Sequence, residues 1–227
     1  MKKTIALLLV LAMALTLCAC GSRDISDPKN NPLYKKMAKK MDIDFLAQDV
    51  DEIDSEEESI SVYLNNDQPL DYPCVFEQGN GTSLQLPMTY GDLCDAGWTL
   101  EYEEISDPFP ADEVLWYTFV NADGKTIGAS IWNMSDTPVD VREAAVHQLQ
   151  FGDSYSEIFT VNGIGVGSTV QEVLDVFGMP SGCHYYEWKD GGDSFDFDYD
   201  SEDGKSSLSF FVDTKTNLIF GISYYQD

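Results

Sequence analysis

The chain has 227 residues, of which 43% are hydrophobic, and a formal net charge of −27 at pH 7. The charge is unevenly distributed, because eight of the 13 basic residues precede Met41 and 38 of the 40 acidic residues lie after it. Such an acidic surface repels a phosphate backbone, which excludes nucleic acid as a partner. It suits cationic partners, divalent ions or simple solubility.

The first 19 residues have the features of a secretory signal peptide. Lys2 and Lys3 form a basic start, and residues 5–17 form an apolar run that is too short to span a membrane. The following stretch, Leu-Cys-Ala-Cys at 17–20, resembles the lipobox of bacterial lipoproteins, in which cleavage precedes a cysteine that receives diacylglycerol. The resemblance implies that Cys20 is the first mature residue. It also implies that acyl chains anchor the protein to the outer face of the cytoplasmic membrane of a Gram-positive bacterium.

Residues 20–58 are expected to form a flexible tether, first basic and then acidic. Lysines at positions 35, 36, 39 and 40 could form one or two amphipathic turns attracted to an anionic membrane, or a merely solvated segment. The acidic stretch 42–58 contains few large apolar side chains and is typical of a linker. The folded part is therefore expected to begin near Ser59.

Turn and cap patterns recur at a fixed spacing in the remaining chain. Asp-Gly pairs, which favour hairpins, begin at Asp123 and Asp203, 80 positions apart. The same offset relates Thr89 to Thr169, each followed three positions later by an acidic residue, which is an N-cap pattern. We expect short helices over 90–96 and 170–177, each ending at a glycine in a left-handed C-cap.

Each predicted helix is followed by segments with the alternation of antiparallel strands. These segments are 99–103, 114–121 and 126–134 in the first part, and 184–189, 194–200, 207–213 and 217–225 in the second. The stretch 139–149 fits either a helix or a turn followed by a strand, and we favour the second. The matching order predicts an α+β fold of two tandem repeats, 59–145 and 146–227, each a short helix packed on an antiparallel β-sheet.

Residues 161–181 carry a resemblance to a known family. The run from Thr169 and Glu172 to Gly178 and Pro180 resembles a signature shared by uncharacterised Gram-positive lipoproteins, outer-membrane-assembly small lipoproteins and the β-lactamase inhibitor protein superfamily. The first repeat lacks the terminal proline, having Trp98 after its glycine. The resemblance implies short helices on one face of an antiparallel sheet, and members of the superfamily mostly bind proteins.

The sequence does not predict a catalytic site, a metal site or a cofactor. His147 and His184 are the only histidines, and neither lies in a zinc-binding pattern. Asp196, Asp198 and Asp200 resemble the start of an EF-hand loop, but the glycine required at the sixth position is missing. We therefore expect no enzyme and identify no small-molecule substrate. A cell-wall-associated hydrolase and a weak calcium-binding surface protein are the alternatives.

The period-two pattern of the second repeat predicts a face that binds a partner. If Phe195, Phe197 and Tyr199 face the helix, the neighbouring aspartates must occupy the opposite face together with Phe211. The offset of 80 places Trp116 and Ile131 on the same face of the first repeat. We expect a protein-binding module with aromatic anchors, and acids that steer a basic protein partner. Burial of the two repeats against each other is the alternative. The candidate residues are Trp116, Ile131, Asp196, Asp198, Asp200, Phe211 and Tyr225.

Overall fold

The computed structural model describes the folded part of the chain and a few residues before it. The described residues are 35–36, 38–39, 50–55, 59–64, 69–70, 73–79, 81–102, 104–152, 154–155, 159–187 and 193–227. Cys20 and the predicted signal peptide lie outside them. Within these ranges no helix is long and apolar enough to cross a membrane.

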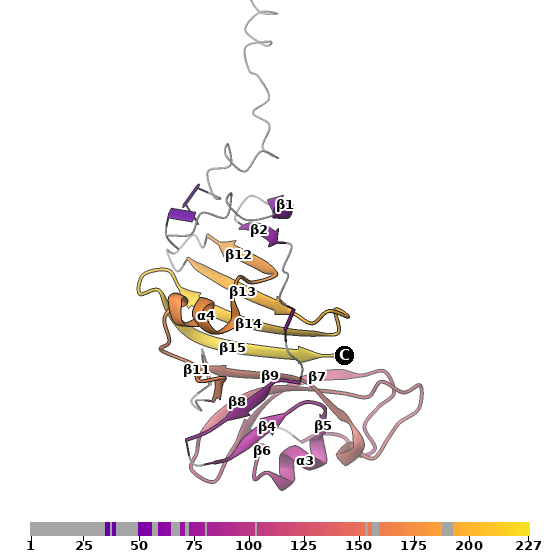
Figure 1. The fold of residues 1–227 in the computed structure, drawn as a ribbon. Helices are drawn as coiled ribbons and strands as arrows, with labels where there is room; N and C mark the ends of the chain where they lie inside the picture. Colours follow the sequence, from indigo (N-terminus) through magenta and orange to yellow (C-terminus); the bar gives the residue numbers. More distant parts are fainter. Residues whose placement is uncertain are drawn as a thin grey trace, which may run out of the picture.

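Within the described ranges, eleven strands form one antiparallel sheet that runs through the molecule (Figure 1). Its strand order is β1-β2-β12-β13-β14-β15-β9-β8-β7-β6, and β5 pairs with β9. The strands are β1 (Val50–Ser55), β2 (Ser59–Leu64), β5 (Met88–Thr89), β6 (Thr99–Leu100), β7 (Val114–Val120), β8 (Thr126–Trp132), β9 (Ala145–Gly152), β12 (Gly182–Tyr186), β13 (Ser194–Asp200), β14 (Ser206–Asp213) and β15 (Leu218–Gln226).

Two short helices and a small sheet pack on one face of the large sheet, which we call the inner face (Figure 1). The helices are α3 (Tyr90–Asp95) and α4 (Val170–Phe177). The small sheet has the order β11-β10-β3-β4 and consists of β3 (Val75–Glu77), β4 (Ser83–Gln85), β10 (Thr160–Val161) and β11 (Ile164–Gly165). The fold is therefore a mixture of helix and sheet, and most of it is antiparallel sheet.

Aromatic contacts join these elements to the inner face of the sheet. Phe177 of α4 lies against Tyr199 and Phe210, with ring centroids 5.3 Å apart in both pairs. Phe76 of the small sheet contacts Phe151 of β9 at 4.9 Å. These rings are large and almost fully buried except for that of Phe177. Their burial supplies much of the hydrophobic stabilisation of the fold.

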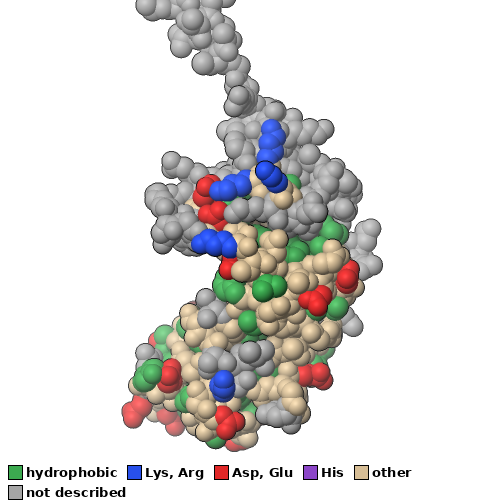
Figure 2. Space-filling view, turned by 90° about the vertical axis from the view of Figure 1, so that its left-hand side faces the viewer, with side chains coloured by type: hydrophobic (Ala, Val, Ile, Leu, Met, Phe, Trp, Pro, Cys, Tyr) green, Lys and Arg blue, Asp and Glu red, His purple; other side chains and the backbone are tan. Residues whose placement is uncertain are grey.

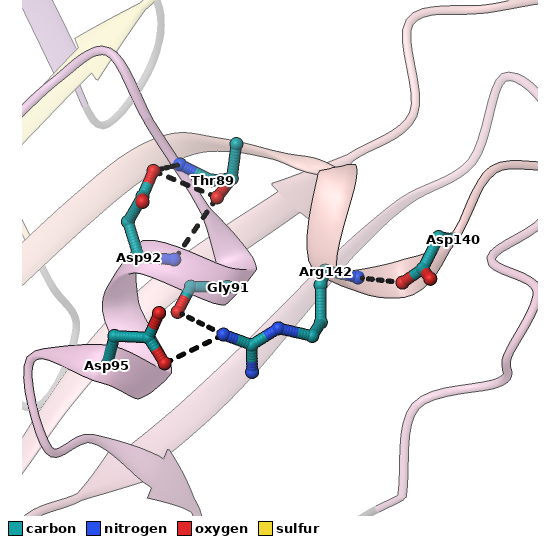
Figure 3. A network of polar contacts seen from close by, with 6 residues as sticks. All are labelled: Thr89, Gly91, Asp92, Asp95, Asp140 and Arg142. Carbon is teal, nitrogen blue, oxygen red and sulfur yellow. Dashed lines mark hydrogen bonds and ion pairs between the residues drawn. The ribbon is translucent and has the colours of Figure 1, made fainter.

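Both helices begin at the predicted residues because each threonine cap forms a complete capping box. At α3 the amide of Asp92 donates to Thr89 Oγ1 at 3.1 Å, and the Asp92 carboxylate accepts from the Thr89 amide at 2.8 Å (Figure 3). The same pair of bonds joins Thr169 and Glu172 at α4. These bonds satisfy main-chain donors that a helix start otherwise leaves unpaired.

The two helix ends differ slightly from the predicted left-handed cap. Gly178 ends α4 with φ +75° and ψ −155°, a region that is open essentially to glycine alone. At α3 the cap is Ala96, and Gly97 follows it with φ +92°. The positive φ that was predicted is present at both glycines, but the conformation at Gly178 lies outside the left-handed helical region.

The segment of uncertain structure before β9 forms a turn and then a strand, as favoured from the sequence. The turn is a short 3₁₀ helix, η2 (Val141–Glu143). The Arg142 guanidinium donates to the Gly91 carbonyl at 3.2 Å and to Asp95 Oδ1 at 2.7 Å, and Asp140 caps the turn (Figure 3). Arg142 therefore ties this turn to α3.

Part of the acidic segment expected to be a linker is a strand. β1 pairs in an antiparallel register with β2, with Ile53 opposite Val62 and Ser55 opposite Ile60. An acidic sequence is compatible with this place, because β1 ends the order of the sheet and a charged edge strand resists further pairing. The linker prediction therefore failed for residues 50–55.

The basic segment also contacts the folded part. Residues 35–36 and 38–39 are helical, and Lys36 Nζ lies 2.5 Å from Glu187 Oε1 and 3.4 Å from Asp193 Oδ2. Figure 2 shows basic side chains gathered next to acidic ones at this end of the molecule. The carboxylate of Glu187 raises the pKa of Lys36.

Candidate functional site on the outer face of the sheet

The face of the large sheet opposite α3, α4 and the small sheet is the candidate site, and we call it the outer face. Strand registers arrange its residues in rows that cross the sheet. One row consists of Trp116, Ser130, Gln148, Tyr225, Ser207 and Asp200. A second row includes Thr118, Gly128, Gln150, Ser223, Ser209 and Asp198. A third includes Gly152, Gly221, Phe211, Asp196, His184 and Ser61.

The second half of the sheet follows the predicted alternation. Phe195, Phe197 and Tyr199 are buried on the inner face, and Asp196 and Asp198 occupy the outer face between them. The two halves meet edge to edge, through the pairing of β9 with β15. Burial of one half against the other, the alternative considered from the sequence, is therefore contradicted.

Ile131 is the one candidate residue that the structure places on the wrong face. It is fully buried and pairs with Leu115 of β7, on the same side of the sheet as buried Ala129. Trp116 and Ser130 lie on the other side, because side chains alternate along a strand. Ile131 is therefore part of the core and is withdrawn as a binding residue.

A one-residue difference between the two Asp-Gly hairpins explains this error. In the first hairpin Val120 pairs with Thr126, whereas in the second Asp200 pairs with Ser207 instead of Ser206. The offset is therefore 80 on the first strand of each hairpin and 81 on the second. Because a shift of one residue moves a side chain to the opposite face, a uniform offset of 80 gave the wrong face for Ile131.

The aspartates of the outer face form a network with a histidine that the sequence did not identify. His184 Nε2 lies 2.7 Å from Asp198 Oδ2, and its Nδ1 lies 2.7 Å from Ser61 Oγ. Ser209 Oγ donates to Asp198 Oδ1 at 2.6 Å. The hydrogen bond with Asp198 raises the pKa of His184. Burial, together with the charge of Asp198, raises the pKa of Asp196 to about 7.

This network limits what the aspartates can do. Asp198 is already bonded to His184, and the raised pKa of Asp196 reduces its charge near neutral pH, so neither is well suited to steering a partner. Ser61, His184 and Asp198 are the residue types of a hydrolytic triad. However, Ser61 lies in β2, which pairs with β1 and β12 on its two sides. The main-chain N–H groups of its strand therefore bond within the sheet and cannot stabilise an oxyanion as such a triad requires.

Tyr225 belongs to an aromatic ladder across three strands. The ring of His147 stands edge-on to Trp132 at 4.7 Å and to Tyr225 at 4.3 Å. Burial lowers the pKa of His147 and raises that of Tyr225 to about 12. Phe211 is likewise half-buried and lies 6.1 Å from Phe220. The two predicted anchors therefore have rings that are already packed against neighbours.

Trp116 is the most exposed of the predicted anchors. Its side chain is 41% exposed, and its Nε1 donates to the Tyr155 hydroxyl at 2.7 Å. Both rings lie over Gly128, where an added Cβ would be 2.5 Å from each of them. A cavity of about 110 Å³ is lined by Tyr102, Trp116, Tyr117 and Thr118. Tyr102 lies in the predicted strand 99–103 and Tyr155 lies outside the periodic segments, and sequence reasoning singled out neither as a site residue.

The described residues include no group of three or more His, Cys, Asp and Glu side chains that could hold a metal ion. No disulfide joins Cys74, Cys94 and Cys183 to one another. Comparison of the chain with family models, with curated proteins and with solved structures found no match.

Proposed function

We propose that this protein is a membrane-anchored, non-catalytic interaction module that binds a basic protein on the outer face of its sheet. The observation that supports this most is a group of exposed apolar side chains at β7. On the outer face of this strand Val114 is 52% exposed and Trp116 41%, and nearby Tyr102 is 86% exposed. Neighbouring exposed apolar groups in an acidic protein are typical of an interaction surface.

Trp116 has the properties of a binding anchor. Its indole is large and partly exposed, and the hydrogen bond to Tyr155 holds it in place before a partner arrives. A side chain held in position loses little conformational entropy on binding, so more of its contact energy contributes to affinity. Tryptophan is also among the residues enriched at energetically dominant positions of interfaces.

The test is the affinity of the partner for two variants with matched exposed positions. We expect Trp116→Ala to weaken binding by about 1 to 2 kcal/mol, roughly five- to thirtyfold, because it removes the most exposed aromatic anchor. Val176→Ala is the control, since Val176 is 46% exposed but lies on α4, on the opposite side of the sheet. Isothermal titration of the folded variants measures both. Equal affinities for Trp116→Ala and the wild type would place the binding surface elsewhere.

The proposed lipid anchor at Cys20 is tested independently of partner binding. We expect Cys20→Ser to abolish labelling of the protein by a radioactive fatty acid, because only a thiol accepts the thioether-linked lipid. The variant should also remain uncleaved or be released from the membrane. Labelling of the variant at the level of the wild type would contradict the lipoprotein assignment.

We also propose that the two halves of the sheet are repeats. Two observations support this: α3 precedes β6 to β9 in the chain as α4 precedes β12 to β15, and β7 and β13 are related by the offset of 80. In this view β2, from the segment assigned to the first repeat, adds to the edge of the second beside β12. The boundary expected between residues 145 and 146 falls at the start of β9, whereas this correspondence places β9 in the first repeat.

A further inference from the structure

The edge of the sheet at β7 is only partly covered. β6 pairs with β7 at two positions, Thr99 with Val120 and Leu100 with Phe119, and the Glu101 amide then donates to the Thr118 carbonyl at 3.0 Å. No strand among the described residues continues this pairing toward the start of β7. The edge therefore changes from covered to open near Thr118.

The hydrogen-bonding direction along β7 identifies the open groups. The Glu113 carbonyl accepts from the Asn133 amide at 3.0 Å and so points toward β8, whereas the Thr118 carbonyl points toward β6. Because these directions alternate along a strand, the N–H and C=O groups of Val114 and Trp116 point toward the open edge. Among the described residues, no main-chain hydrogen bond with these four groups is found.

An open edge with exposed apolar side chains is unusual, since proteins normally shield edges with charge, proline or a covering segment. From the open edge we infer that an extended segment of a basic protein adds to β7 as a further strand, beside Val114 and Trp116. The cavity bordered by Tyr102 and Trp116 lies where β6 stops following β7, and it would receive one side chain of that segment. This inference rests on the proposed function and narrows it to the edge of the sheet.

Charge identifies the class of partner. The described residues that precede β7 in the chain, 101–102 and 104–113, contain five acidic residues and no basic one. A segment with lysine or arginine is complementary to these acids, which would also speed its encounter with the edge. A second copy of the chain is disfavoured, because pairing of two β7 edges would bring both sets of acids together in molecules that each carry −27.

The experiment uses the full chain and a synthetic ten-residue peptide of alternating valine and lysine. Two further peptides are compared, one with glutamate in place of lysine and one with N-methyl groups on alternate main-chain nitrogens. We expect the lysine peptide to bind and to slow amide hydrogen exchange at Val114 and Trp116. The N-methylated peptide should bind at least about fivefold more weakly, because it cannot donate along the edge. The glutamate peptide should bind more weakly still.

The same edge is tested by changing the protein instead of the peptide. Val114→Pro removes an N–H that points away from β8, so the sheet tolerates it, whereas the edge loses a donor. Val114→Thr keeps the donor and is the control. We expect the proline variant alone to lose about fivefold in peptide affinity. If Val114→Pro does not fold, the comparison of the methylated and unmethylated peptides on the wild-type protein still decides the question.

Three results would overturn the strand addition. The first is absence of lysine-peptide binding, and the second is equal binding of the methylated and unmethylated peptides. The third is slow amide exchange at Val114 and Trp116 without any peptide, together with self-association of the chain in sedimentation experiments. The proposed function is judged separately by the effect of Trp116→Ala on the whole partner. A loss of partner affinity there, with equal binding of the methylated peptide, would retain the outer face as the binding surface and reject the edge.

Discussion

We expect Gly152→Ala to lower the free energy of unfolding by about 3 kcal/mol or more, because two separate penalties meet at this residue. Gly152 ends β9 and pairs with Gly221 of β15, at the line where the two halves of the sheet join. Its φ is +72°, which a residue with a Cβ adopts only with strain. An added Cβ would also lie 2.4 Å from the Phe220 carbonyl oxygen and 2.5 Å from Val166 Cγ2. The first contact is with main chain, so the strands themselves must move apart.

Gly163→Ala is the matched control for this experiment. Gly163 has a similar φ of +82°, but no atom lies within 4 Å of the position of an added Cβ. Its substitution should cost only the conformational strain, about 1 kcal/mol. Denaturant unfolding of the two variants measures the difference. Equal losses of stability would show that β9 and β15 are not in close contact at Gly152.

The second large effect is a pH dependence of stability that Asp196 controls. In the folded state its pKa is raised to about 7 from an ordinary value of 3.8, so the folded protein binds more protons than the unfolded chain between these values. Stability must therefore fall as pH rises from about 4 through 7. The pKa of His184 is also raised, so its contribution is likewise lost as pH rises through its folded pKa. Asn at position 196 is always neutral and removes the penalty of charging the carboxylate.

We expect Asp196→Asn to be about as stable as the wild type near pH 4.5 and more stable by about 1 to 2 kcal/mol at pH 8. This figure is below the full linkage value, because water partly screens a half-buried group. Urea unfolding at several pH values measures it. The lowered pKa of His147 has the opposite effect on stability, but it is present in both proteins and cancels in the difference.

The control for this pH series is Asp136→Asn, which removes a charge from an exposed turn. It should shift stability by a small amount that changes little between pH 4.5 and 8. Parallel pH curves for Asp196→Asn and the wild type would contradict the raised pKa, and with it the burial of a carboxyl group on the outer face.

Local signals in the sequence predicted most of the regular elements. Thr89 and Thr169 could be recognised as caps because a capping box needs only residues within one turn. The strands β13 and β14 could be predicted, together with their faces, because buried Phe195, Phe197 and Leu208 alternate with polar residues. In these places local preference and tertiary packing favour the same structure, so a single sequence is sufficient.

The remaining features depend on contacts between distant segments. Residues 50–55 lack the composition of a typical strand and are ordered by pairing with β2. Ile131 was given the wrong face because the register of a hairpin is set by its turn, which a uniform offset ignores. The bond of His184 with Ser61 joins residues 123 positions apart, and Tyr155 reaches Trp116 across 39. Nothing near these residues in the sequence indicates their partners.

The most direct test of the proposed binding surface is photo-crosslinking in living cells from two positions of the anchored protein. A photoreactive amino acid is placed at Ser207, which lies in the outer-face row between Tyr225 and Asp200, or at Gln171, which is exposed on α4. We predict a crosslink to one basic protein from position 207 and none to it from position 171, and we predict that Trp116→Ala weakens the crosslink from 207. Crosslinking to the same protein from position 171 alone, or crosslinking from 207 that Trp116→Ala leaves unchanged, would contradict the assignment of binding to the outer face.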